Sequence, residues 1–178
     1  MTEHSAGTPP EPTTGLRWGI KTSFVTYVQR MPDGRGWVGE GAVPVSGNEI
    51  VFPPVQAGTR PTADGGTDRF WAFGGDIRFT GHSGLLFVRI AFPVLTLRDG
   101  SAELTVAGQS EEESAERIPL VTLHLEVAPA ADGLEVWSGT DVRLTEAGAA
   151  LFNDVYPAGE AFDPLTLTLP ILPGIDRR

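Results

Sequence analysis

Apolar and polar residues alternate with a period of two through most of this sequence. In Leu120–Val127 an apolar side chain occupies every second position, and Glu103–Ala107 repeats the pattern around Leu104 and Val106. This period is that of a β-strand with one face buried and the other exposed. The same criteria predict further strands at Gly36–Val43, Glu49–Phe52, Arg69–Phe79, Leu85–Leu97, Leu134–Val142 and Leu165–Leu172.

Turn-forming residues separate these strand candidates. The chain has 22 glycines and 15 prolines, and they fall in nearly every gap, so the connections are expected to be turns rather than crossover helices. We therefore predict a mainly β protein, built as an antiparallel β-sandwich or a partly closed barrel. The polar stretches Gly58–Asp68 and Gln109–Arg117 are expected to be loops.

Two segments depart from the alternation, and one or two short helices are expected there. Thr145 is a suitable N-cap for a helix that ends before Pro157. Arg17–Gln29 admits two interpretations. Its β-branched residues suit a strand, but a helix would also place Ser23 and Tyr27 one turn apart on one face.

Length and composition bound the organisation of the chain. A protein of 178 residues and 19.0 kDa fits one domain with a sizeable core, which we place at residues 15–172. Residues 1–14 are rich in Pro, Thr and Glu and are expected to be a flexible lead, with a short tail at 173–178. No secretory signal is visible, so the expectation is a cytoplasmic protein, with an exported or envelope-associated one as the alternative.

Charge and residue content exclude several classes of function. A formal net charge of −10 opposes binding to a phosphate backbone, so no nucleic-acid partner is expected. No apolar run reaches the length that crosses a bilayer, so the protein is not expected to be integral to a membrane. Without cysteine there is no disulfide, thiolate nucleophile or iron–sulfur cluster.

One of the three histidines occupies a distinctive position. His82 lies in RFTGHSGLL between Gly81 and Gly84, at the end of an apolar strand, whereas His4 lies in the lead and His124 on a polar strand face. Glycines at such a place let a ligand or another backbone approach closely, although a plain hairpin tip would have the same composition. Neighbouring Ser83 lacks the sequence context of a hydrolase nucleophile.

Four separated segments resemble the HtaA domain of bacterial haem-uptake proteins. They are WGIKTSFVTYV (Trp18–Val28), FTGHSGLL (Phe79–Leu86), FPVLTL (Phe92–Leu97) and LTEAGAALFNDVYPAGEAFDPLTLTL (Leu144–Leu169). Their order and spacing also fit that family. The resemblance implies a β-sandwich-like fold with short helices that binds one haem.

The resemblance also implies roles for individual residues. Tyr27 would supply a phenolate oxygen to the iron of ferric haem b, which makes it the expected metal ligand. His82 would hydrogen-bond that oxygen and orient the ring. Ser23 would reach a haem propionate or the surroundings of the ligand. Phe24 and Tyr156 would contact the macrocycle, and a core role for Tyr156 stays open.

The function that follows from this resemblance is haem uptake, transfer or intracellular storage, not catalysis. Its partners would be haem and a protein that donates or accepts haem, and the sequence does not indicate an oligomeric state. Two alternatives remain: a peroxidase-like or catalase-like haem enzyme, and a β-sandwich binding module that no longer binds haem.

Overall fold

Two antiparallel sheets of unequal size make up the protein. The computed structural model describes residues 10–110, 115–129 and 133–171, so His4, the tail 173–178 and most of the predicted lead lie outside the described residues. Within those ranges ten strands form one sheet and three form a second, and every pair of neighbouring strands is antiparallel. The helices are α1 (Thr22–Arg30) and α2 (Glu146–Leu151), with 3₁₀ turns η1 (Ser46–Asn48) and η2 (His82–Gly84).

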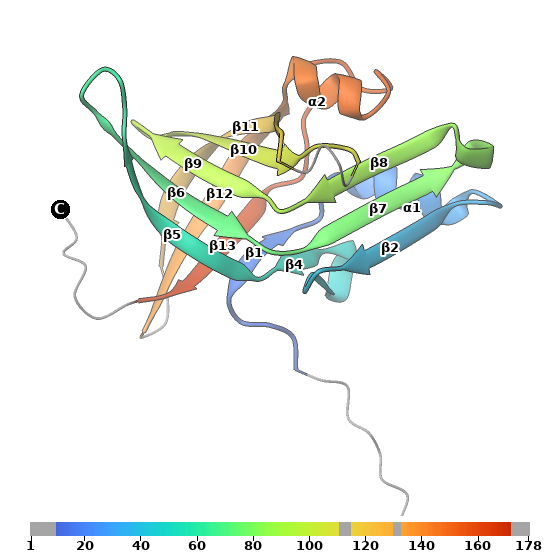
Figure 1. Ribbon diagram of the computed structural model, residues 1–178. Coiled ribbons are helices and arrows are strands. Elements are labelled where there is room, and N and C mark those ends of the chain that lie inside the picture. Colours follow the sequence, from blue (N-terminus) through green and yellow to red (C-terminus); the bar gives the residue numbers. More distant parts are fainter. Residues whose placement is uncertain (1–9, 111–114, 130–132, 172–178) are drawn as a thin grey trace, which may run out of the picture.

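The larger sheet curls into a half-barrel (Figure 1). Its two edge strands are not paired with each other, so the barrel stays open and the prediction of a mainly β, partly closed barrel with short helices is confirmed. In spatial order the strands are β3 (Val43–Pro44), β4 (Ile50–Phe52), β1 (Gly15–Trp18), β13 (Leu165–Pro170), β12 (Leu134–Leu144), β11 (Arg117–Ala128), β10 (Ser101–Ala107), β9 (Val94–Arg98), β6 (Thr67–Phe73) and β5 (Pro54–Pro61).

The smaller sheet consists of β2 (Arg35–Gly39), β7 (Asp76–Gly81) and β8 (Leu86–Ala91), in that spatial order. Figure 1 shows its hairpin β7–β8 extending away from the half-barrel, and α1 contacts both β7 and β2. The hairpin therefore carries η2, and with it His82, to one end of the molecule beside the helix.

Three predicted strands are each divided between the two sheets. Arg69–Phe79 was predicted as one strand, but Gly74 and Gly75 interrupt it and send β6 and β7 into different sheets. Gly75 has a φ of 108°, which a residue with a side chain rarely adopts. Leu85–Leu97 divides in the same way at Phe92 and Pro93, and Gly36–Val43 divides between β2 and β3. All three predictions of a continuous strand were wrong because apolar content does not reveal where the chain passes from one sheet to the other.

Other expectations need smaller corrections. Gly58–Asp68 was predicted as a loop, but most of it belongs to β5 and β6, which pair as an edge hairpin. Its side chains are polar because that edge faces solvent. The helix after Thr145 is confirmed, and Thr145 Oγ1 accepts the Gly148 N–H at 2.9 Å, but α2 ends at Leu151, well before Pro157. Val127 is exposed rather than on the buried face.

Alternation places the core where the sequence analysis expects it. In β10 and β13, and from Val121 to Leu125 in β11, buried side chains alternate with threonines and charged residues that face outward. Burying such side chains contributes about 1.5–3 kcal/mol each. Three of the four tryptophans, Trp18, Trp71 and Trp137, lie in this core, whereas Trp37 is half exposed on β2 beneath Arg78. No helix of the described chain is both long and apolar enough to span a bilayer.

A buried ion pair lies within the smaller sheet, and its arginine also binds the segment after β10. The Arg89 guanidinium donates from Nη2 to Asp76 Oδ2 at 2.8 Å and from Nη1 to the carbonyls of Gly108 and Ser110. Burial raises the pKa of Asp76, but the hydrogen bonds and charges of Arg78 and Arg89 outweigh it and hold that pKa below its usual value. Asp76 is therefore ionised at neutral pH.

Candidate functional site

The segment Arg17–Gln29, for which a strand and a helix were both considered, contains the end of a strand followed by a helix. Strand β1 ends at Trp18, the chain turns at Ile20 with a φ of 61°, and α1 begins at Thr22. The Asp163 carboxylate accepts the Thr22 N–H at 2.9 Å and also binds the Thr22 hydroxyl. A carboxylate from a distant segment thus satisfies a free amide at the first turn of the helix.

Helical periodicity turns Tyr27 toward solvent. The buried face of α1 carries Phe24, Val25 and Val28, which pack into the core. Residues between these positions point the other way, so Ser23 is exposed and the Tyr27 side chain is 50% exposed. A phenol on a helix whose opposite face is packed in the core, and which itself remains accessible, is suited to binding a ligand from solution.

His82 lies in a turn with an unusual backbone. His82, Ser83 and Gly84 have φ values of 50°, 55° and 92°, three consecutive left-handed residues. Gly81, just before them, packs so closely on Met31 that a Cβ there would lie 2.8 Å from its sulfur. The end of the hairpin can therefore lie directly against the end of α1.

This arrangement brings Tyr27 and His82 together although they are 55 residues apart in the sequence. Tyr27 Oη lies 2.6 Å from His82 Nε2, and the ring centroids are 5.9 Å apart. A neutral imidazole can accept the phenol proton at Nε2, and the other tautomer can donate to a phenolate. His82 is thus both a hairpin-tip residue and the polar partner of Tyr27.

Asp33 also contacts the turn of His82, and the sequence analysis did not identify it. Its Oδ2 accepts the Ser83 N–H at 2.6 Å, and this hydrogen bond is the main reason that the pKa of Asp33 lies below its usual value. The sequence Met-Pro-Asp-Gly at 31–34 is typical of a β-turn, and the Gly34 N–H indeed donates to the Met31 carbonyl. The turn was predictable from the sequence, but the contact of Asp33 with Ser83, 50 residues away, was not.

The remaining predicted site residues lie at different depths around α1. Ser23 is one turn before Tyr27, and Phe24 is buried edge-to-face between Phe79 and Phe152, with ring centroids 5.3 and 5.1 Å away. Tyr156 is partly buried against the same aromatic cluster, and Lys21 Nζ lies 5.0 Å from the centroid of its ring. Roles for Ser23, Phe24 and Tyr156 as haem contacts stay predictions.

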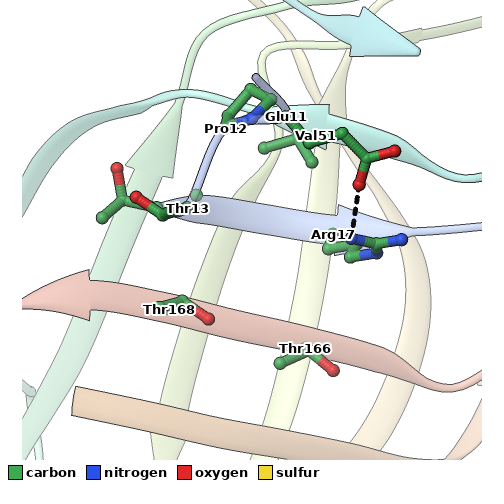
Figure 2. Close-up of a pocket in the computed structure, with 9 residues that line it drawn as sticks. Glu11, Pro12, Thr13, Arg17, Val51, Thr166 and Thr168 are labelled. Carbon is green, nitrogen blue, oxygen red and sulfur yellow. Dashed lines mark hydrogen bonds and ion pairs between the residues drawn. The ribbon is translucent and has the colours of Figure 1, made fainter. Parts of the chain in front are cut away.

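A separate hollow lies on the outer face of the half-barrel (Figure 2). It has a volume of about 340 Å³, and Thr166 and Thr168 of β13 line it together with Arg17 of β1 and the segment Glu11–Thr14. Arg17 is bound to both Glu11 and Glu49, so its positive charge is already neutralised. None of the five predicted site residues lines it.

Other ionisable side chains that could take part in a functional site form hydrogen bonds with neighbouring charged residues. His124 binds the neighbouring Glu126 at 2.8 Å on an exposed strand face. Asp76, the acidic residue of β7, binds Arg78 and Arg89. In the described ranges, no three His, Asp or Glu side chains are arranged to hold a metal ion directly.

Comparison with known proteins identifies a family whose sequence pattern this chain matches. The sequence model of the family described as Htaa matches residues 13–168. A comparison with curated proteins found no match.

Three crystal structures from Corynebacterium glutamicum are similar. The N-terminal domain of HtaA is 30% identical, with a TM-score of 0.68, and the match covers 88% of this chain and 96% of that one. The C-terminal domain of HtaA is 23% identical, with a TM-score of 0.67 and coverages of 86% and 93%. The heme binding protein HtaB is 18% identical, with a TM-score of 0.62 and coverages of 87% and 91%. The two likenesses below 25% identity concern the fold alone.

Proposed function

The chain belongs to the HtaA family, and from this premise we propose that it binds ferric haem through Tyr27, with His82 supporting the ligand. The observation that carries the proposal is the 2.6 Å contact between Tyr27 Oη and His82 Nε2 on an accessible surface. HtaB, a heme binding protein, shares the fold, so this fold is compatible with haem as the ligand.

The chemistry of the pair fits ferric iron. A free phenol ionises near pH ~10, so a tyrosine ligand at neutral pH depends on groups that stabilise the phenolate. Fe³⁺ supplies most of that stabilisation when it is bound, and tyrosine is an established haem ligand. His82 accepts the phenol proton or donates to the oxygen, and in either state it fixes the orientation of the Tyr27 ring.

Exposure of the site favours haem as cargo rather than as a permanently enclosed cofactor. The Tyr27 side chain is 50% exposed, and Leu85, directly after the turn that holds His82, is 84% exposed. A ligand can therefore reach this end of the hairpin directly from solution. We propose uptake, transfer or storage of haem, with a donor or acceptor protein as the partner.

A haem enzyme is the weaker candidate. A peroxidase or catalase requires an acid–base group on the side of the iron opposite the ligand. Arg78 and Arg89, the arginines nearest in sequence to His82, both bind the Asp76 carboxylate, and His124 binds Glu126. These contacts favour a carrier over a catalyst.

Titration of the purified protein with hemin, followed by visible absorption, tests the proposal. We expect saturation at one haem per chain and the high-spin spectrum of a ferric tyrosinate. A weak spectrum that grows without saturation would instead support a binding module that no longer takes haem.

Replacing His82 tests the supporting role. In His82→Ala we expect hemin affinity to fall about 10–100-fold, the usual cost of removing a partner that orients a metal ligand, together with a changed spectrum. The fold should persist because His82 is exposed. His124→Ala is the matched control, since it removes the hydrogen bond of another exposed histidine far from the site and should leave the titration unchanged.

The oxidation state provides a second test. A phenolate is a hard, anionic ligand and prefers Fe³⁺ to Fe²⁺, so chemical reduction of the loaded protein should weaken binding. We expect faster transfer of haem to an excess of apomyoglobin after anaerobic reduction with dithionite. Equal transfer rates from the ferric and ferrous forms would contradict ligation by Tyr27.

A further inference from the structure

The backbone conformation of the turn that holds His82 is one that its residues do not favour. His82 and Ser83 both adopt left-handed φ values, although neither is glycine. Such residues persist only where surrounding contacts hold them. The position of the imidazole therefore depends on whatever fixes this turn.

Asp33 supplies that contact. Its Oδ2 accepts the Ser83 N–H at 2.6 Å, and the His82 N–H also contributes to lowering the pKa of Asp33. Consecutive amides in such conformations form a small concavity that binds an anion, and here the anion is a carboxylate of the same chain. The carboxylate thus stabilises the left-handed turn.

The location of Asp33 connects this turn to Tyr27. Asp33 lies in the β-turn 31–34, and the Met31 N–H at its start donates to the carbonyls of Tyr27 and Val28. Met31 also packs on Gly81, the residue before His82. The segment after α1 therefore contacts the end of the helix that carries Tyr27 and the turn that carries His82.

We infer that Asp33 is a positioning residue that holds the His82 turn against the end of α1, so that Nε2 meets the Tyr27 oxygen. Its significance for haem rests on the proposed function, but its effect on the Tyr27–His82 hydrogen bond exists without haem. The side chain acts through the backbone of Ser83 and needs no contact with the ligand.

Three variants test the inference in the haem-free protein. Asp33→Ala removes the acceptor, Asp33→Asn keeps an amide oxygen that can accept the same N–H, and Asp64→Ala is the control. Asp64 likewise stabilises an exposed turn, between β5 and β6, through the Thr62 hydroxyl and the Gly66 N–H. NMR would follow hydrogen exchange of the Ser83 amide and the chemical shift of the His82 Nε2.

We expect Asp33→Ala to expose the Ser83 amide to exchange and to shift His82 Nε2 toward the value of an unpaired imidazole. Asp33→Asn should largely restore both signals, and Asp64→Ala should match the parent. If Asp33→Ala leaves His82 Nε2 unchanged, the inference is overturned, whether or not the protein binds haem.

A hemin titration then separates this inference from the proposed function. We expect Asp33→Ala to lose about tenfold in affinity, at the lower end of the range for residues that orient a ligand's partner, with a spectrum resembling that of His82→Ala. Failure of the parent to bind hemin would refute the proposed function and leave the NMR result standing. Parent-like affinity and spectrum in Asp33→Ala would overturn the role in haem binding.

Discussion

Tyr27→Phe is expected to abolish specific hemin binding. The substitution removes only the phenol oxygen, so the ring and the packing of α1 remain. Loss of residues that merely orient a ligand costs about 10–100-fold in affinity, and loss of the ligand itself should exceed that, by at least about a hundredfold. The high-spin tyrosinate spectrum should disappear in a visible-absorption titration with hemin.

The second tyrosine provides a matched control for this experiment. The chain has two tyrosines, and Tyr156→Phe likewise removes one phenol oxygen, from a ring packed on Phe152 and Phe162. We expect Tyr156→Phe to keep the tyrosinate spectrum. Retention of that spectrum in Tyr27→Phe and its loss in Tyr156→Phe would transfer the ligand role to Tyr156.

Asp76→Asn is expected to have the largest effect on stability. Arg89 is 2% exposed and its guanidinium lies on the Asp76 carboxylate, so the substitution leaves a buried positive charge without its negative counterpart. Breaking a buried pair in this way costs about 3–5 kcal/mol, a large part of the stability of an ordinary domain. Urea unfolding at neutral pH would measure the loss.

Asp141→Asn is the control, because Asp141 and Arg143 form a similar pair two residues apart but on the surface. It should change the free energy of unfolding by less than about 0.5 kcal/mol. An equal effect of the two substitutions would show that burial of the Asp76 pair has no energetic consequence.

The pH dependence of the Asp76 effect has a definite sign. The pKa of Asp76 is lower in the folded protein than in the unfolded chain. Ionised Asp76 therefore stabilises the folded state fully at pH values above the pKa of an unfolded aspartate, about 3.9. It is lost as the pH falls through the folded pKa. The difference in stability between the parent and Asp76→Asn should therefore shrink in acid, and a constant difference would contradict the assignment.

The class of fold and much of its core were predictable because they follow from local patterns. The alternation in β10, β11 and β13 corresponds to their buried and exposed faces. The N-cap at Thr145 marks the start of α2 because a hydroxyl satisfies an amide three residues away. Where the segment after Trp18 becomes helical was not predictable, since Asp163 caps it from far along the chain.

The candidate site was predictable in its residues but not in its geometry. Tyr27 and His82 came from a resemblance to a family, and the residues by themselves left His82 as a possible hairpin tip. Phe24 follows the exposed Ser23, yet it packs in the core, because helical periodicity turns the two side chains to different faces. Asp33 was missed because its partner, Ser83, lies 50 residues away.

By itself, the sequence determined the β class, the turns and the membership of a family, since each depends on neighbours along the chain or on motifs in order. Only the tertiary structure decided that β6 and β7 enter different sheets, that the β7–β8 hairpin lies against α1, and that Tyr27 and His82 meet at 2.6 Å. The physical reason is that these features depend on contacts between segments far apart in the chain. Such contacts form only when the two sheets and the helix pack together, and no local pattern encodes them.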